Sequence, residues 1–295
     1  MLTASSSATR IKFLGAALAA ALVALGVIEL RKEHGRYARQ NSDHAEVMTS
    51  RPIREGEKTL SILFVGNSFT FDDDMPAMLV NLAASDCATA PPLAVKAVTS
   101  PGATLKFMME STDALKWAKA QHFHYVVLQE RSDWYETADN YSQGFSNALT
   151  WRNKVQALDE QPILFETWPD APGSSHFTDP DSAAFGISPD VAATNAAHAT
   201  QLIGAELGIP IAKVGEAFAK AQNVAGAPNL YDPDFHHPST AGSYLAALIF
   251  YRTLTGRSGE DARYRPDGVD AAQRAFLLDV AAAIVPEATD AKCPG

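Results

Sequence analysis

The chain has 295 residues, of which 46% are hydrophobic and 20% are charged, so it can bury a full globular core. Its formal net charge of −10 is uneven: residues 1–60 hold nine Lys or Arg against six Asp or Glu, a balance of +3 that leaves −13 for the remainder. This acidic body carries no basic stripe, which argues against nucleic acid as a partner because phosphate binding requires Lys and Arg.

An uncharged run at residues 13–28, rich in Ala and Leu, lies between basic residues near the N-terminus. As a helix it would span about 24 Å against about 30 Å of bilayer hydrocarbon, so it is short for a membrane span. It is also slightly long for the core of a signal peptide. We therefore expect residues 1–30 to be a signal peptide or an N-terminal membrane anchor, and the protein to be extracytoplasmic, either periplasmic or secreted. The basic residues after the run favour a cytoplasmic body instead, although long domains can be translocated regardless of such charges.

Residues 31–58 are polar and lack periodicity, which predicts a linker. From residue 60 onward, buried-strand patterns alternate with helical patterns, which predicts a parallel sheet covered by helices on both faces. Strands are predicted at residues 60–66, 93–98, 125–128, 162–167 and 211–214. Helices are predicted at residues 75–84, 105–118, 142–157, 191–207, 239–251 and 269–284, with a long surface loop at 169–190. The expected fold is a three-layer α/β/α sandwich with a mainly parallel five-stranded sheet, forming one domain over residues 59–290.

The first chemical signal is Gly66-Asn67-Ser68, which follows the buried strand expected at residues 60–66. Ligands bind beyond the carboxyl ends of the strands in an open α/β sheet, so Ser68 lies where a nucleophile is needed. An ordinary strand-to-helix turn would also explain this short sequence, and a second signal is required.

The second signal is the segment 234–239, which reads Asp-Phe-His-His-Pro-Ser. An Asp three residues before a His can accept a hydrogen bond from imidazole Nδ1–H, which fixes the tautomer and leaves Nε2 to take a proton from a serine. This spacing selects Asp234 as the orienting residue and His237 as the general base. His236 remains a rival base, and Asp232 a rival orienting residue.

Together, the two motifs resemble those of the SGNH/GDSL hydrolase superfamily. Its first block is matched by residues 66–68, with Asn where many members have Asp, and its Asp-x-x-His block is matched by Asp234 and His237. The glycine of its second block fits Gly102, in the loop after the second expected strand. The resemblance covers about residues 60–255 and implies a flavodoxin-like sheet and a serine esterase that requires no metal and no cofactor.

The family's third block, usually Gly-x-Asn-Asp, departs from its pattern in this chain, where the third expected strand is followed by Gln129 and Glu130. Gln129 carries the same amide donor one methylene longer. The resemblance therefore assigns the oxyanion hole to the backbone N–H groups of Ser68 and Gly102 and to the Gln129 amide, although Gln129 would also suit buried backbone. Similar loops in esterase branches of the superfamily favour a carbohydrate O-acyl esterase with a short acyl group. The residues expected to bind substrate are Asn67, Glu130, Trp134 and Trp168.

Other classes fit less well or stay open. An α/β-hydrolase elbow requires Gly two residues after the nucleophile, where this chain has Thr70, and no Gly-rich loop carries the Lys of a phosphate-binding loop. A non-catalytic, membrane-tethered glycan-binding protein and an acyltransferase on the same scaffold both remain open. The three consecutive Asp at residues 72–74 suit a solvated helix start better than a cation site. Cys87 and Cys293 lack metal-ligand spacing and are either a disulfide pair or free thiols.

Overall fold

The computed structural model describes residues 47–53, 58–87, 90–136 and 140–286. The chain divides into two units, Met1–Asn41 and Ser42–Gly295, and the first lies wholly outside the described residues. The expected signal peptide or anchor at residues 1–30, and most of the expected linker at residues 31–58, therefore also lie outside them. Within the described ranges, no helix combines the length and the apolar character that crossing a membrane requires.

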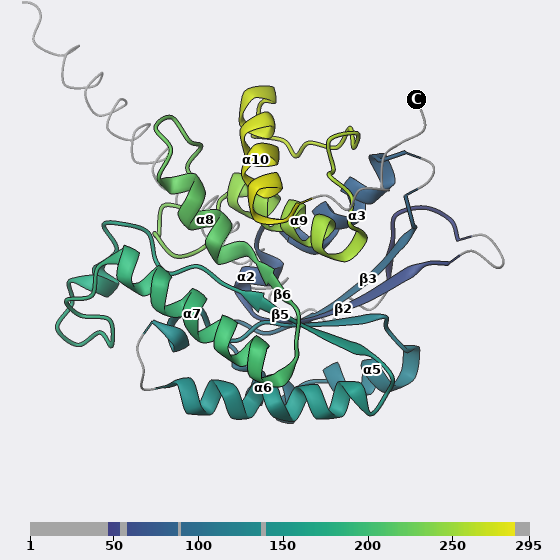
Figure 1. Ribbon diagram of the computed structural model, residues 1–295, viewed down its shortest axis with the longest axis horizontal. Coiled ribbons are helices and arrows are strands. Elements are labelled where there is room, and N and C mark those ends of the chain that lie inside the picture. The colour runs from purple at the N-terminus through teal and green to yellow at the C-terminus, as the bar shows by residue number, and fades with distance from the viewer. Residues whose placement is uncertain (1–46, 54–57, 88–89, 137–139, 287–295) are drawn as a thin grey trace, which may run out of the picture. The chain divides into compact units, whose positions relative to one another are not determined.

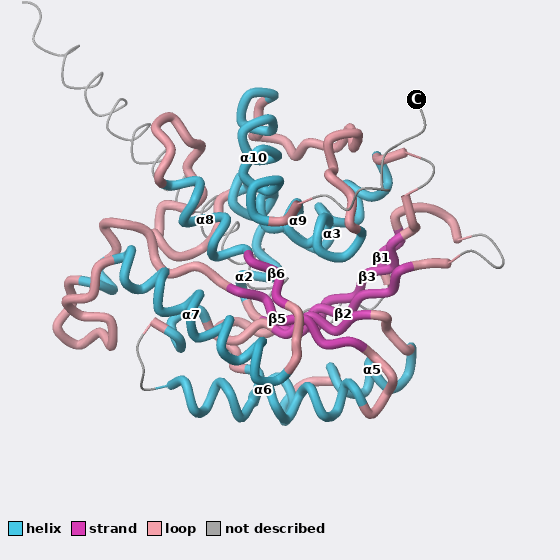
Figure 2. Tube along the Cα trace, in the orientation of Figure 1, coloured by secondary structure: helices cyan, strands magenta, loops and turns pink. Residues whose placement is uncertain are grey.

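A single six-stranded sheet forms the middle layer, with the strand order β1-β3-β2-β4-β5-β6 (Figure 2). The strands are β1 (Met48–Thr49), β2 (Leu60–Gly66), β3 (Leu93–Thr99), β4 (Tyr125–Leu128), β5 (Gln161–Glu166) and β6 (Ile211–Lys213). The five predicted strands are confirmed, and all of them pair in parallel. The prediction of five strands in total is wrong by one, because β1 adds to the edge of the sheet in antiparallel orientation within the expected linker. A strand of two residues is too short to show periodicity.

Helices cover both faces of the sheet (Figure 1). One layer contains α3 (Met75–Ser85), α8 (Val214–Gln222), α9 (Thr240–Thr255) and α10 (Ala271–Ile284). The other contains α4 (Leu105–Ser111), α5 (Ala114–Gln121), α6 (Tyr141–Gln156) and α7 (Pro189–Leu207). Alternate residues of β2 pack against the two helical layers, since Ile62 and Phe64 belong to one core cluster and Leu63 and Val65 belong to the other. The expected three-layer α/β/α sandwich is confirmed.

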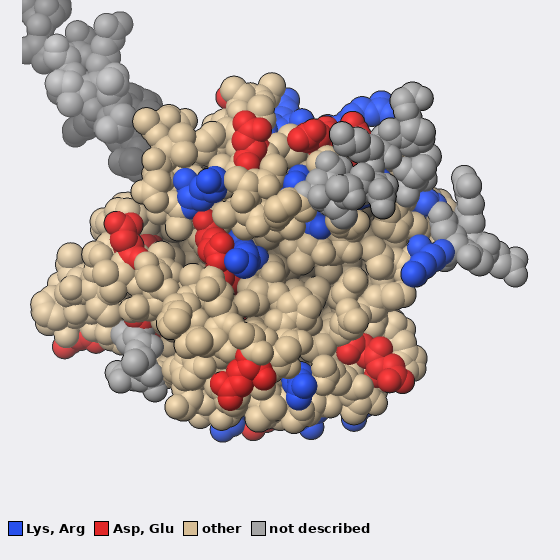
Figure 3. All heavy atoms as spheres, in the orientation of Figure 1, with Lys and Arg blue, Asp and Glu red and all other residues tan. Residues whose placement is uncertain are grey.

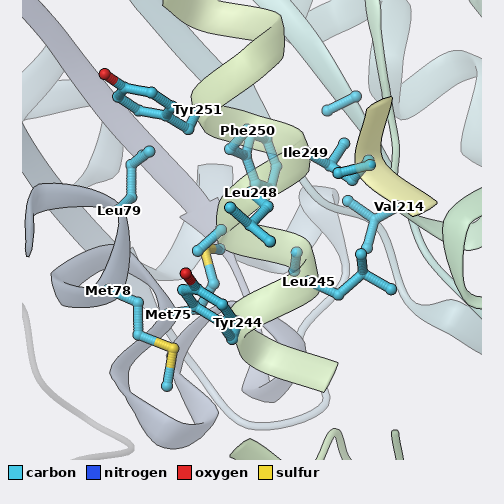
Figure 4. Packing of buried hydrophobic residues seen from close by; sticks show 14 of the residues in the cluster. Met75, Met78, Leu79, Val214, Tyr244, Leu245, Leu248, Ile249, Phe250 and Tyr251 are labelled. Atoms are coloured by element: carbon cyan, nitrogen blue, oxygen red, sulfur yellow. The ribbon is translucent and has the colours of Figure 1, made fainter. Parts of the chain in front are cut away.

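Helix α9 is buried along most of its length, and its side chains fill the space between α3 and the sheet (Figure 4). The ring of Phe250 meets Phe64 of β2 and Phe165 of β5 edge-on, with centroids 5.0 and 4.8 Å apart. The Ser239 side chain caps the helix by accepting a hydrogen bond from the Gly242 N–H. Because α9 is fixed in the core, the loop that enters it, residues 231–239, is held at one edge of the sheet.

Among the helices that cover the sheet, two regions differ from the sequence predictions. The helix predicted at residues 105–118 is divided into α4 and α5, because the Thr112 hydroxyl donates to the Met108 carbonyl (2.5 Å) and accepts from the Ala114 N–H (3.3 Å), which competes with the helical pattern. Helix α8 is absent from the sequence predictions. Its buried residues recur at helical spacing, so the signal is present but directly follows a short strand.

Cys87, just beyond the end of α3, forms a disulfide bond. Cys293, the other cysteine of the chain, lies outside the described residues. Beside Cys87, the buried side chains of Asp86 and Arg257 form an ion pair with Nε and Oδ2 2.7 Å apart. The hydrogen bonds from Arg257 and its neighbours outweigh burial and hold the pKa of Asp86 below its usual value.

Candidate active site

The loop that carries Ser68 is held tightly at the carboxyl end of β2. Asn67 is extended and caps the short helix α2 (Ser68–Phe71) by accepting a hydrogen bond from the Phe69 N–H at 3.2 Å. A Cβ at position 66 would lie 2.5 Å from Gln129 Oε1 and 2.7 Å from Thr70 Oγ1, so only glycine fits there. Ser68 therefore follows an abrupt strand end at the start of a helix, and 7% of its surface is exposed.

Gln129 braces this loop from the end of β4. Its Oε1 accepts hydrogen bonds from the Asn67 N–H (3.0 Å) and the Thr70 hydroxyl (2.6 Å). Its Nε2 donates to Asn67 Oδ1 and to the Glu130 carbonyl (3.2 Å), and the residue is fully buried. Both amide N–H groups are thus already donated inside the protein. In this geometry Gln129 supports the nucleophile loop and points no donor into the site, in contrast to its expected place in the oxyanion hole.

The loop before α9 brings together the two residues of the second motif. His237 Nδ1 lies 2.6 Å from Asp234 Oδ2, while Asp234 Oδ1 accepts the backbone N–H groups of His236 (3.0 Å) and His237 (2.9 Å). Partial burial acts to raise the pKa of Asp234, but these hydrogen bonds outweigh burial and hold it below its usual value. The carboxylate therefore stays charged and fixes the orientation of the His237 ring.

The serine and histidine loops meet at the same edge of the sheet. Phe69, the residue after Ser68, has its ring centroid 4.8 Å from that of His236 and 6.0 Å from that of His237. One turn further along the chain, Asp72 Oδ2 lies 3.6 Å from His237 Nε2. His237 thus presents its Nε2 edge to the segment that begins at Ser68.

A hollow of about 160 Å³ opens beside Ser68. Its lining consists of Asn67, Ser68, Phe69, Gly102, Arg131, Ser132, Asp133, Asp170, His176 and His236. Gly102 adopts φ +59° in the loop after β3, a left-handed conformation that favours glycine. Among the described residues, nothing accepts a hydrogen bond from the backbone N–H of Ser68 or Gly102. A larger groove of about 690 Å³ between α7 and α8 contains neither Ser68 nor His237.

Basic side chains of the hollow are each paired with a carboxylate. Arg131 lies 2.5 Å from Asp133, His236 Nδ1 lies 2.6 Å from Asp170, and His176 Nε2 lies 2.7 Å from the buried Glu136. Asp170 and His176 come from the long loop predicted at residues 169–190. Sequence reasoning missed both, since that loop has no periodicity and His176 has no recognisable partner in the chain nearby.

Three of the residues expected to bind substrate do not line the hollow. Trp168 is fully buried and stacks between Phe69 (centroids 4.4 Å apart) and Phe218 (4.0 Å). The expectation that it binds substrate is therefore wrong, and Trp168 is a core residue. Glu130 is also a structural residue and not a substrate-binding one, because its buried carboxylate accepts hydrogen bonds from two backbone N–H groups and from the side-chain amide of Asn147. Trp134 packs against the hydrophobic core on the α6 side of the sheet. Asn67 does line the hollow.

Within the described ranges, no group of three or more His, Cys, Asp or Glu side chains has an arrangement that could hold a metal ion. The three Asp at residues 72–74 form a short 3-10 turn, in which Asp73 and Asp74 adopt positive φ angles of 51° and 55°.

Comparison with known proteins gives matches among solved structures only, since no protein-family model and no curated protein matches the chain. A protein from Slackia heliotrinireducens, proposed to be an SGNH hydrolase, is 29% identical with a TM-score of 0.56, over 67% of this chain and 100% of its own. A DUF4886 family protein from Bacteroides uniformis gives a TM-score of 0.64 at 17% identity, over 78% of this chain and 97% of its own. An acetylxylan esterase from Geobacillus stearothermophilus gives a TM-score of 0.50 at 16% identity, over 68% of this chain and 96% of its own.

The two structures below 20% identity are similar to this chain in fold alone. On the similarity to the Slackia heliotrinireducens protein, this chain belongs to the SGNH/GDSL hydrolase superfamily.

Proposed function

We propose that the protein is a serine esterase, a carboxylic ester hydrolase that acts on a short acyl ester through an acyl-enzyme. The observation that carries this proposal is the Asp234–His237 hydrogen bond of 2.6 Å at the edge where Ser68 begins α2. A charged Asp234 holds the imidazole in the tautomer with its proton on Nδ1, so Nε2 can accept the proton of Ser68. No step requires a metal ion or an organic cofactor.

In the proposed reaction, Ser68 Oγ attacks the ester carbonyl while its proton passes to His237 Nε2. The resulting oxyanion is bound by the backbone N–H groups of Ser68 and Gly102, which have no other acceptor among the described residues. His237 then gives the proton to the departing alcohol, leaving the acyl group on Ser68. Water attacks this acyl-enzyme with His237 again as the base, which releases the carboxylic acid and restores Ser68.

The size and polarity of the hollow support a small acyl group on a polar alcohol. A space of about 160 Å³ suits an acetyl group and part of its alcohol, and has no room for a long acyl chain. Arg131, Asp133 and Asp170 offer both hydrogen-bond donors and acceptors, as the hydroxyl groups of a sugar require. An O-acetyl group on a carbohydrate is therefore the substrate we propose, in keeping with the acetylxylan esterase among the similar structures.

The proposed location is outside the cytoplasm, where the segment at residues 13–28 would serve as a signal or a membrane tether. The disulfide at Cys87 supports this location, because disulfides persist in oxidising compartments. On the face drawn in Figure 3, acidic and basic side chains are interspersed with uncharged surface, which agrees with a substrate other than nucleic acid.

Hydrolysis of p-nitrophenyl esters with acyl chains of two to eight carbons tests the proposal. The two-carbon ester should be the best substrate, and Ser68→Ala and His237→Gln should each lower kcat by at least about 10³-fold. Both variants should keep the wild-type circular dichroism spectrum. Wild-type rates in either variant would show that the proposed site is wrong.

The same assay separates the alternatives. A glycan-binding protein without catalysis would bind sugars but hydrolyse none of the esters. An acyltransferase would form the acyl-enzyme with one burst of p-nitrophenol. It would release more p-nitrophenol only after a sugar acceptor was added, and the acyl group would then be found as an ester on the sugar.

A further inference from the structure

Two histidines that are neighbours in the sequence face different carboxylates. His236 Nδ1 lies 2.6 Å from Asp170 Oδ1, whereas His237 Nδ1 lies 2.6 Å from Asp234 Oδ2. Their rings are 4.7 Å apart and almost perpendicular, at 84°. The backbone reaches this arrangement through a positive φ of 63° at Phe235, which is unfavourable for an aromatic residue. The two imidazoles are thus held in separate orientations, each with its own anchor.

Of the two, His236 lies in the hollow beside Ser68 and Gly102. Since Asp170 occupies Nδ1, the ring nitrogen left for a ligand is Nε2, and none of the described residues hydrogen bonds to it. The ring packs on Phe69 with centroids 4.8 Å apart, which limits its rotation.

Asp170 is itself fixed. Its Oδ2 accepts a hydrogen bond from the Ser174 hydroxyl at 2.6 Å, and its side chain is mostly buried, at 12% exposed. Burial acts to lower the pKa of His236, but the hydrogen bond and the charge of Asp170, with Asp234 and Asp133 nearby, outweigh it and raise the pKa. Asp170 therefore fixes the orientation of the ring and shifts its equilibrium toward the form with an N–H at both nitrogens.

We propose that His236, positioned by Asp170, is a specificity-determining residue that binds the alcohol portion of the ester through a hydrogen bond between its Nε2 and a hydroxyl group next to the scissile bond. His237 alone exchanges a proton with Ser68. The ligand class is a polyhydroxylated alcohol, because a hydroxyl group both donates and accepts, and can therefore hydrogen bond to His236 Nε2 together with Arg131 or Asp133. A carboxylate-bearing alcohol would meet the charges of Asp133 and Asp170. This inference rests on the proposed esterase function.

The test compares kcat/KM for two acetyl esters, a monoacetylated methyl xyloside, which carries free hydroxyl groups, and p-nitrophenyl acetate, which carries none. His236→Gln should lower the kcat/KM for the sugar ester relative to that for the aryl ester by about 10-fold, since the hydrogen bond at Nε2 is lost. The loss should fall mainly on KM for the sugar ester. His198→Gln on the exposed side of α7, which lies in the separate groove, is the matched control and should leave both values unchanged.

Asp170→Asn should lower the ratio of the two kcat/KM values to the same extent, because Asp170 acts through His236. The double variant should then lose no more selectivity than either single variant, a coupling that a merely structural role would not produce. An unchanged ratio in His236→Gln would overturn the proposal. A loss on both esters equal to that of His237→Gln would also overturn it, and would make His236 the base. If wild-type protein hydrolyses neither ester and Ser68 proves inert, the esterase function itself fails, which is a different result from an active enzyme with no preference for the sugar.

Discussion

His237 lies between two carboxylates, and they are not equivalent. Asp234 is hydrogen bonded to Nδ1 at 2.6 Å, whereas Asp72 is 3.6 Å from Nε2, beyond hydrogen-bond distance. The orientation of the His237 ring therefore depends on Asp234. Asp72 acts on His237 through its negative charge, near Nε2, the nitrogen that receives the serine proton.

Asp234→Asn should accordingly lower kcat by about 10³- to 10⁴-fold, because an amide can stabilise the wrong tautomer of His237. Asp72→Asn removes the same charge from the other side of the ring and should cost less than about 10-fold. Steady-state kinetics on p-nitrophenyl acetate measure both variants. Equal losses in the two would contradict the assigned roles.

At the scale of single elements, the turn from β2 into α2 depends on Gln129. Removing its side chain would leave the Asn67 N–H, the Asn67 side chain and the Thr70 hydroxyl without their buried partner. Unsatisfied buried polar groups each cost about 1–3 kcal/mol. The loop carrying Ser68 would then lose the geometry on which attack depends.

Gln129→Ala should lower the free energy of unfolding by about 2–4 kcal/mol and lower kcat more than it raises KM. The matched control is Gln143→Ala, on the exposed face of α6, where the lost hydrogen bond to Asn147 should cost less than about 1 kcal/mol. Urea unfolding and ester kinetics together provide the measurement. A Gln129 variant of normal stability with reduced activity would instead indicate a direct role in the oxyanion hole.

The sequence is most informative where a local pattern and a local contact coincide. The run from Leu60 to Gly66 predicts β2 because buried parallel strands are continuously apolar, and the Asp234–His237 pair is three residues apart in one turn. The position of Trp168 after a strand end predicts a place in the pocket, yet its large apolar surface is buried between Phe69 and Phe218. Asp170 escapes prediction because it meets its partner, His236, across 66 residues.

At the scale of the whole molecule, the stability of the sheet at different pH values depends on a buried carboxylate, that of Glu166. Glu166, at the end of β5, accepts the Glu216 N–H through Oε1, while its buried Oε2 has no hydrogen-bond partner among the described residues. Burial, with the nearby charge of Glu216, raises the pKa of Glu166 to about 7 despite that hydrogen bond. An exposed Glu in the unfolded chain titrates near 4.5.

Because the folded pKa lies above the unfolded one, the unfolded chain gives up this proton first as the pH rises. The contribution of Glu166 to stability is therefore lost progressively between about pH 4.5 and 7, by on the order of 3 kcal/mol. Glu166→Gln keeps the acceptor for Glu216 and cannot ionise, so it should be more stable than wild type at pH 8 and about equal at pH 4.5. Urea unfolding at both pH values measures this, with the exposed Glu206→Gln as control. A variant no more stable than wild type at pH 8 would contradict the account.

The central claim is that Ser68 is a nucleophile activated by His237, and covalent labelling tests it most directly. Wild-type protein treated with a fluorophosphonate should gain one adduct, located at Ser68 by peptide mass spectrometry, and His237→Gln should be labelled at least about 100-fold more slowly. Folded wild-type protein that stays unlabelled, or is labelled at another serine, would contradict the claim.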